Sequence, residues 1–77
     1  MADADSAYRR WDDATRERVR AVRVAAERRW GDPDVSVSEI HGLWRIRSLN
    51  ELSHPEPYWV GHSLEGAEAA VATKPAL

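Results

Sequence analysis

The sequence contains no cysteine, and its four glycines stand singly at positions 31, 42, 61 and 66. The lack of cysteine excludes disulfides, thiolate zinc sites and a thiol nucleophile, and nothing indicates secretion or redox chemistry. Isolated glycines also exclude a glycine-rich phosphate-binding loop. We therefore expect a cytoplasmic protein that carries no cofactor.

Long apolar runs are also missing, so no membrane span is expected. The first six residues, MADADS, are acidic where a signal peptide is basic and then apolar, so export is not expected either. The 77 residues allow one apolar centre, which predicts a single small domain over 1–77 with disordered tails at 1–5 and 75–77. A chain of this length buries only about 60% of its unfolded surface, which disfavours an enzyme with a built cleft.

The first half of the chain has a helical repeat. Seven residues recur there at intervals of three or four: Tyr8, Trp11, Thr15, Val19, Val22, Ala26 and Trp30. This spacing predicts an amphipathic helix from Ser6 to Trp30, capped by Asp5 or Ser6 and ended by Gly31 and Pro33.

Such a helix would be about 37 Å long, which exceeds the width of a core built from so short a chain. Its first turns, with Tyr8 and Trp11, would then either fray or project. We favour projection under a second copy or a partner, because two aromatic side chains are costly to leave in water.

A hairpin follows the helix. His41 and Gly42 predict a two-residue turn that pairs Ile40 with Leu43 and Val37 with Ile46. This register separates an apolar face, formed by Val35, Val37, Trp44 and Ile46, from a polar face, formed by Ser36, Ser38, Arg45 and Arg47. Glu39 falls on the apolar face, so a bulge or a longer turn remains an alternative.

The last third of the chain predicts a loop, a strand and a helix. Residues 49–57 contain two prolines and no periodicity, which is typical of a surface loop. Residues 58–60 read as a short strand, and Ser63 is placed to cap a helix over 64–73. The predicted fold class is α+β: a long N-terminal amphipathic helix packed on a small three-stranded antiparallel sheet, with a short C-terminal helix (α-β-β-β-α).

The segment Val60-Gly61-His62-Ser63-Leu64-Glu65-Gly66 resembles the G-H-S-L-G-G elbow around the nucleophilic serine of lipases and other α/β-hydrolases. The resemblance would imply a catalytic role for Ser63. However, the elbow needs glycine two places after the serine, and this chain has Glu65 there. A helix cap is the favoured role of Ser63, and no catalytic residue is predicted.

The three histidines, His41, His54 and His62, are separated by 13 and 8 residues. Metal sites commonly draw a close pair such as H-x-x-x-H from one element, and this sequence has none. No metal site is therefore predicted, and the histidines are assigned to turns and the surface.

The α-β-β-β-α order also resembles the layout of the double-stranded-RNA-binding domain. That family places a lysine-rich cluster at the start of its last helix, facing the phosphates. In this chain the matching stretch is acidic, with Glu65 and Glu68. The resemblance is therefore limited to the layout.

The predicted long helix carries eight arginines from Arg9 to Arg29 against four acidic residues, although the whole chain has a net charge of −2. Arg9, Arg16, Arg20 and Arg23 would form a strip along one edge of its apolar face, which could follow a phosphate backbone. The favoured alternative is that these arginines are solvated and paired with nearby acids such as Asp13 and Glu17.

Two functions follow as hypotheses. The first is a non-catalytic binding or regulatory protein of the inhibitor or adaptor type, which docks another protein or a second copy of itself. Its predicted contact residues are Tyr8, Trp11, Val24, Glu51, His54, Glu56 and Trp59. The alternative is a nucleic-acid-binding protein that uses Arg9, Arg16, Arg20, Arg23, Arg45 and Arg47.

Overall fold

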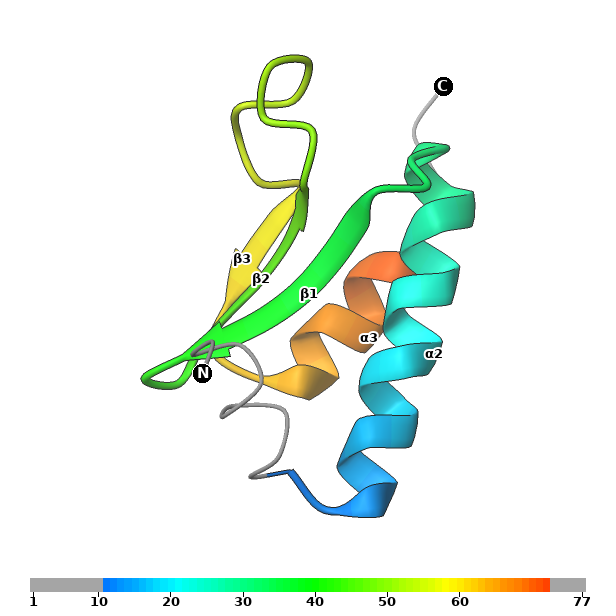
Figure 1. The fold of residues 1–77 in the computed structure, drawn as a ribbon. Coiled ribbons are helices and arrows are strands. Elements are labelled where there is room, and N and C mark those ends of the chain that lie inside the picture. Colours follow the sequence, from blue (N-terminus) through cyan, green and yellow to red (C-terminus); the bar gives the residue numbers. More distant parts are fainter. Residues whose placement is uncertain (1–10, 73–77) are drawn as a thin grey trace, which may run out of the picture.

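Within residues 11–72 the chain folds as two helices on one side of a three-stranded antiparallel sheet (Figure 1). The structure is a computed structural model that describes residues 11–72, so the tails predicted at 1–5 and 75–77 lie outside it. This arrangement confirms the predicted α+β class and the α-β-β-β-α order. Its elements are α2 (Asp13–Trp30), β1 (Val35–Ile40), β2 (Leu43–Ser48), β3 (Trp59–Gly61) and α3 (Leu64–Ala72).

The predicted start of the long helix at Ser6 is wrong, because α2 begins at Asp13. Asp12 has an extended backbone with a ψ of 173°, and its side chain accepts a hydrogen bond from the Thr15 amide at 2.7 Å. The helix begins directly after this N-cap, so α2 is 18 residues long, which is about 27 Å. Helix α2 therefore does not include the turns around Tyr8 and Trp11 that were expected to project beyond the core.

Trp11 lies just before the cap and packs on the sheet. Its ring stacks on that of Trp44 in β2, with centroids 5.4 Å apart and planes inclined by 16°. The side chain is thus partly buried by this chain itself. The apolar repeat does not reveal this change, because Trp11 packs against the core here as the repeat predicts.

The other end of α2 agrees with the prediction. Gly31 adopts the left-handed conformation with a φ of 63°, and its amide donates a hydrogen bond to the Glu27 carbonyl. Most residues pay a steric cost in this conformation, whereas glycine does not. The chain then turns through Asp32 into β1.

The predicted hairpin register is confirmed, with Ile40 opposite Leu43 and Val37 opposite Ile46. His41 and Gly42 have φ values of 52° and 82°, as a two-residue turn of this type requires. No bulge occurs at Glu39. Its carboxylate instead accepts a hydrogen bond from the Gly42 amide at 2.7 Å, which explains how an acid is accommodated at the end of the apolar row.

The core lies between the helices and one face of the sheet. It is small, and partly buried aromatic rings surround it, including Trp30, Trp44 and Tyr58. α2 packs on β1 and α3, and α3 packs on β2 and β3. The buried apolar residues are Val19, Val22, Ala26, Val35, Ile46, Leu64 and Ala67.

The indole of Trp59 lies against two glycines, one in its own strand and one in α3. A methyl group at Gly61 would overlap the ring, and one at Gly66 would lie 2.9 Å from Trp59 Cζ2. Ser63 caps α3 as predicted, since its Oγ accepts a hydrogen bond from the Gly66 amide at 3.0 Å. Gly66 weakens the helix intrinsically, but it lets α3 approach β3 closely enough to dock.

We expect Gly61→Ala to lower the free energy of unfolding by about 1–3 kcal/mol, because the added methyl overpacks against the Trp59 ring. Chemical denaturation followed by circular dichroism measures this change. The control is the same substitution in a Trp59→Val background, where the ring is absent and the added cost should largely disappear. An equal cost in both backgrounds would show that the contact with Trp59 is not the cause.

Candidate functional site

One face of the sheet is left uncovered by the helices of the described residues. Alternate side chains of a strand point to opposite faces, so the residues between the core positions point away from α2 and α3. In the observed register Ile40 lies opposite Leu43, and Arg45 lies between Ser38 and Val60. We call this side the open face; its side chains are Ser36, Ser38, Ile40, Leu43, Arg45, Arg47 and Val60.

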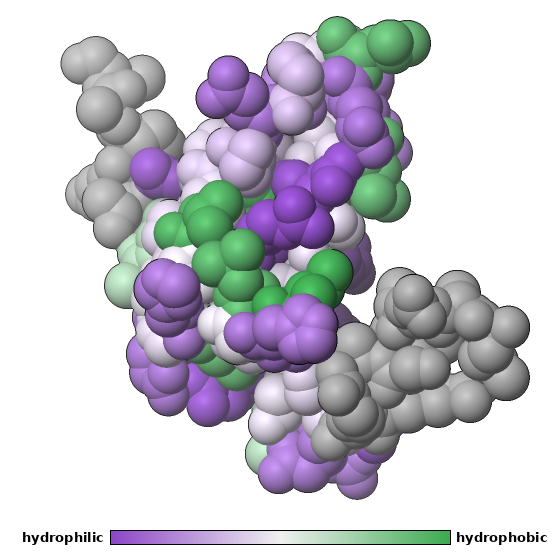
Figure 2. Space-filling model, turned by 90° about the vertical axis from the view of Figure 1, so that its left-hand side faces the viewer, coloured by the Kyte–Doolittle hydropathy of each residue, from purple (hydrophilic) through white to green (hydrophobic). Residues whose placement is uncertain are grey.

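Three exposed apolar side chains gather at one end of the open face. Ile40 is 54% exposed, Leu43 36% and Val60 45%. Figure 2 views this side of the molecule and shows apolar side chains grouped beside hydrophilic ones. Single exposed apolar residues are ordinary, whereas a group on one face is typical of a contact surface. We call these residues the apolar trio.

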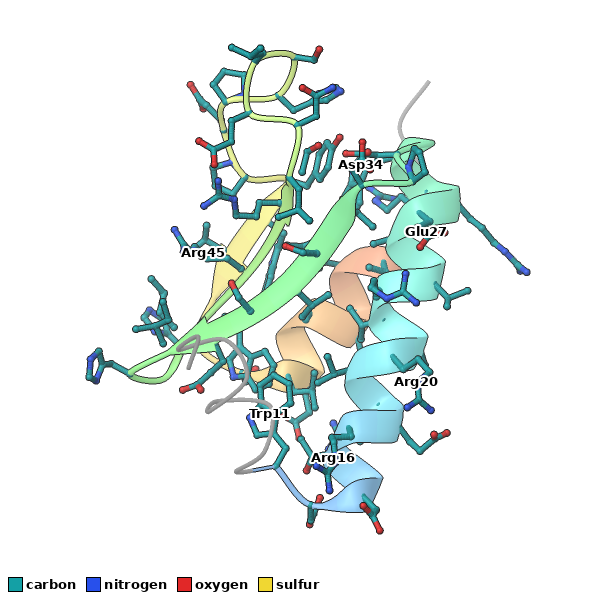
Figure 3. All side chains as sticks on the ribbon, viewed as in Figure 1. Trp11, Arg16, Arg20, Glu27, Asp34 and Arg45 are labelled. Carbon is teal, nitrogen blue, oxygen red and sulfur yellow. The ribbon has the colours of Figure 1, made fainter. Side chains whose placement is uncertain are left out.

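The two arginines of the open face differ in their surroundings. Arg47 forms an ion pair with Glu51 of the following loop, at 2.7 Å. Arg45 points away from the helices (Figure 3), and no carboxylate within residues 11–72 pairs with it. The face therefore presents one partly buried arginine whose positive charge no carboxylate of the described residues neutralises.

The loop over residues 49–58 extends from the sheet beyond the ends of β2 and β3 (Figure 1). Two leucines are exposed on it, Leu49 at 66% and Leu52 at 99%. At its base the Leu49 amide donates a hydrogen bond to the Asp34 carbonyl at 2.9 Å, and the Tyr58 amide donates one to the Ile46 carbonyl at 2.7 Å. The loop thus has a fixed base and an exposed tip.

A buried carboxylate anchors this base to the end of α2. Asp32 is only 6% exposed and accepts hydrogen bonds from the Tyr58 hydroxyl at 2.9 Å and from the Asp34 amide at 2.8 Å. The Tyr58 ring also stacks on that of Trp30, with centroids 4.7 Å apart. No local pattern in the sequence could reveal this anchor, because Asp32 and Tyr58 are 26 positions apart.

Hydrogen bonding shifts the titration of this anchor. The hydrogen bond from the Ser48 hydroxyl contributes most to lowering the pKa of Asp32 below its ordinary value of 3.8, and those from the Asp34 amide and Tyr58 add to it, against the opposing effect of burial. Burial, together with the neighbouring Asp32 carboxylate, raises the pKa of Tyr58. The ionised Asp32 is therefore the form that the folded protein favours.

The residues predicted for partner binding do not form one surface. Trp11 and Trp59 pack on the core side of the sheet, where their rings contact this chain's own side chains. Val24 is 39% exposed, but it lies on α2, which packs on the opposite side of the sheet from the open face. Tyr8 lies outside the described residues.

The three predicted loop residues, Glu51, His54 and Glu56, are exposed. Glu51 reaches the open face through its ion pair with Arg47, and the ring of His54 lies against Tyr58 with centroids 5.7 Å apart. Of these three residues, Glu51 therefore borders the open face, whereas His54 lies beside Tyr58, whose ring stacks on Trp30 of α2. The apolar trio itself was missed, although the predicted turn already placed Ile40 and Leu43 at the end of the polar face.

The arginine strip of α2 is occupied by local ion pairs. Arg16 pairs with Asp13 at 2.9 Å, and the other two pairs are Arg20 with Glu17 and Arg23 with Glu27. The three described arginines of the strip thus have acidic neighbours on their own helix, as the favoured alternative expects. Arg9 lies outside the described residues, and Arg45 and Arg47 lie on the open face, so the residues of the nucleic-acid hypothesis are divided between two sides of the molecule (Figure 3).

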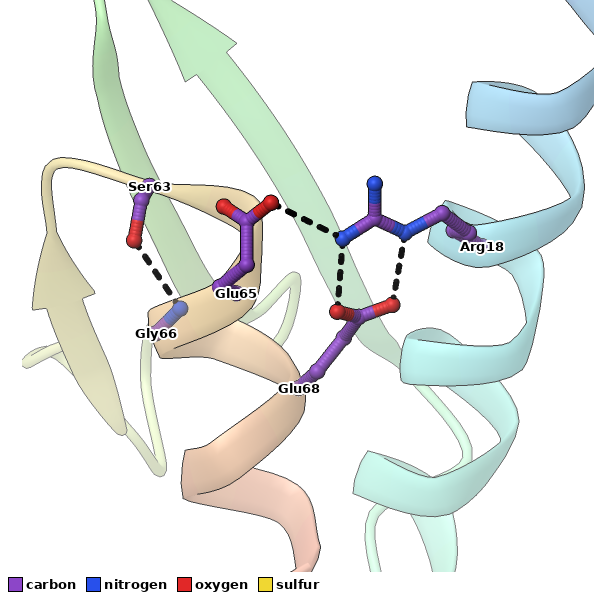
Figure 4. A network of polar contacts seen from close by, with 5 residues as sticks. All are labelled: Arg18, Ser63, Glu65, Gly66 and Glu68. Carbon is purple, nitrogen blue, oxygen red and sulfur yellow. Dashed lines mark hydrogen bonds and ion pairs between the residues drawn. The ribbon is translucent and has the colours of Figure 1, made fainter.

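A further arginine of α2 clamps the two helices together. The Arg18 guanidinium donates to both carboxylate oxygens of Glu68, at 2.8 and 2.7 Å, and to Glu65 at 3.3 Å (Figure 4). This hydrogen bonding lowers the pKa of Glu68 and raises that of Arg18. The acidic start of α3 is therefore used inside the fold, where the double-stranded-RNA-binding layout would present basic residues outward.

Within residues 11–72, no three histidine, aspartate or glutamate side chains are grouped closely enough to hold a metal ion. In the same range, no helix combines the length and apolar character needed to cross a membrane.

No family model, curated protein or solved structure matches this chain.

We expect Asp32→Asn to lower the free energy of unfolding at pH 7, because the amide cannot replace the carboxylate in its three hydrogen bonds. Since folding lowers the pKa of Asp32, its contribution is complete above pH 3.8 and is lost as the pH falls through the folded value. The difference in the free energy of unfolding between the variant and the wild type should therefore become smaller in acid, as measured by chemical denaturation between pH 7 and pH 2. Asp34→Asn, at an exposed neighbouring site, is the control, and a gap that stayed constant with pH would contradict the assignment.

Proposed function

We propose that this protein is a non-catalytic binding module that docks another protein on the open face of its sheet. The apolar trio is the observation that carries the proposal. These three side chains are between 36% and 54% exposed on the side of the sheet opposite the helices, and burying them on a partner would remove that area from water. As part of the same proposal, we place the cysteine-free chain in the cytoplasm.

The loop supports this proposal as a rim to the docking surface. Leu49 and Leu52 are exposed beyond the sheet, and Glu51 contacts Arg47 at the border of the open face. An apolar centre with a polar, solvent-exposed rim is the usual arrangement of a protein interface. Glu51 is the predicted contact residue that belongs to this rim.

Protein is a better partner class than nucleic acid for this surface. Recognition of single strands uses aromatic side chains on which bases stack, and none of the seven side chains of the open face is aromatic. Arg47 and the described arginines of the strip already have carboxylate neighbours, and the net charge of −2 opposes approach to a polyanion.

A catalytic role for Ser63 receives no support. Its hydroxyl oxygen accepts the hydrogen bond that caps α3, and Glu65 follows where the hydrolase elbow requires glycine. The same start of α3 is held against α2 by Arg18. These contacts give Ser63 and its neighbours structural tasks.

The test is a double variant, Leu43→Thr with Val60→Thr, which removes apolar surface while keeping residues that favour a strand. Wild-type protein should capture a partner from its source organism, and the double variant should bind that partner about tenfold more weakly or worse. Isothermal titration with the purified partner measures the ratio, and sedimentation velocity reports whether the partner is a second copy.

The matched control is Val24→Thr, which makes the same kind of change at an exposed position of α2. It should leave the affinity unchanged, and all variants should show the circular dichroism spectrum of the wild type. If the double variant binds as tightly as the wild type, or if Val24→Thr is the one that weakens binding, the open face is not the docking surface.

A further inference from the structure

The open face also indicates the chemistry of its partner, and this inference rests on the proposed function. We infer that the partner is a different protein that presents an acidic, apolar segment, in which a carboxylate reaches Arg45 while flanking apolar side chains cover the apolar trio.

Arg45 stands next to the apolar trio within the register of the sheet. Val60 is its direct partner on β3, and Ser38 is its direct partner on β1. Leu43 precedes it by two residues on the same face, a step of roughly 7 Å along a strand. A ligand that covers Leu43 and Val60 must therefore also approach the Arg45 guanidinium.

The charge of Arg45 is unmatched on this face. None of the seven side chains of the open face is acidic, and no carboxylate in the described part of the chain pairs with Arg45. Arg47, two residues further along the same strand, already forms an ion pair with Glu51 at 2.7 Å. Arg45 is thus the position at which the face can accept a charge from outside.

Covering the apolar trio strips water from Arg45, and a guanidinium without water or a counter-charge is costly to bury. A partner carboxylate removes this cost, because it can accept two parallel hydrogen bonds from the planar guanidinium. For an apolar partner without an acid, the cost of burying Arg45 would cancel much of the binding free energy that the apolar trio contributes. The apolar trio and Arg45 together therefore favour a ligand that has both apolar and acidic side chains over one that is apolar only.

A second copy fits this face less well. A twofold pairing of two open faces brings two copies of Arg45 into one interface, and none of the seven side chains of the face supplies a carboxylate to either copy. Nucleic acid also fits less well, because a phosphate can pair with Arg45 but leaves Ile40, Leu43 and Val60 without an apolar contact. A foreign acidic, apolar protein segment satisfies both parts of the face.

The experiment uses a phage-displayed library of random 12-residue peptides, selected on the full-length chain. The expected sequences combine aspartate or glutamate with neighbouring leucine, isoleucine, valine or phenylalanine. A selected peptide is then synthesised in three forms, with its acid intact, replaced by glutamine and replaced by lysine, and its binding is measured by fluorescence anisotropy at two salt concentrations.

The acidic peptide should bind at least about tenfold more tightly than its glutamine form, as is typical of a hydrogen bond between charged groups. Arg45→Gln should remove this preference, and Arg45→Glu should transfer it to the lysine form. Arg28→Gln changes the net charge equally at an exposed site on α2, so it should leave the preference unchanged.

Three results would overturn the inference, and they separate it from the proposed function. Equal binding of the acidic and glutamine peptides, with binding still lost in the Leu43→Thr and Val60→Thr double variant, rejects the acidic partner and keeps the docking face. Peptide binding that survives in that double variant rejects both. A dimer in sedimentation velocity that the double variant abolishes replaces the foreign partner with a second copy.

Discussion

The structure depends on one constraint: within residues 11–72 two helices cover the sheet, and both lie on the same face. Val22 and Ala26 of α2, Ile46 of β2 and Ala67 of α3 meet in the resulting layer, each almost completely removed from water. The alternation of strand side chains then determines the other side. Once Ile46 and Trp44 point to the helices, Arg45 and its neighbours on the same face must point away from them.

Specific contacts hold the borders of this small core, and each joins segments that are distant in the sequence. Arg18 ties α2 to α3 through Glu68, and Asp32 ties the end of α2 to Tyr58 at the base of the loop. At the opposite end, Trp11 stacks on Trp44. Charges and rings that could have suggested external ligands thus serve to position the helices and the loop around few buried aliphatic side chains.

Because these polar groups are used inside the fold, the functional hypothesis rests on the open face and not on the arginine strip. The arginines of α2 dominate the charge pattern of the sequence, yet those of the strip that the structure describes lie within reach of acids on the same helix. The open face carries fewer charged residues, but its apolar trio is exposed and Arg45 has no carboxylate partner in the described residues. A surface is better judged by what its groups leave unsatisfied than by how many charges it carries.

Sequence patterns by themselves determined the order of the elements, the end of α2 at Gly31, the turn at His41 and Gly42, and the register of the hairpin. These features depend on backbone preferences and short repeats, which act over a few residues. The start of α2 has a local cause, the Asp12 cap, but the apolar repeat continues through Trp11 and does not reveal it. The docking of α3 at Gly66 against Trp59, the anchor at Asp32 and the grouping of Val60 with Ile40 and Leu43 were decided only by the tertiary structure. Each of these depends on which distant segments meet when the core closes, and a local pattern carries no information about that meeting.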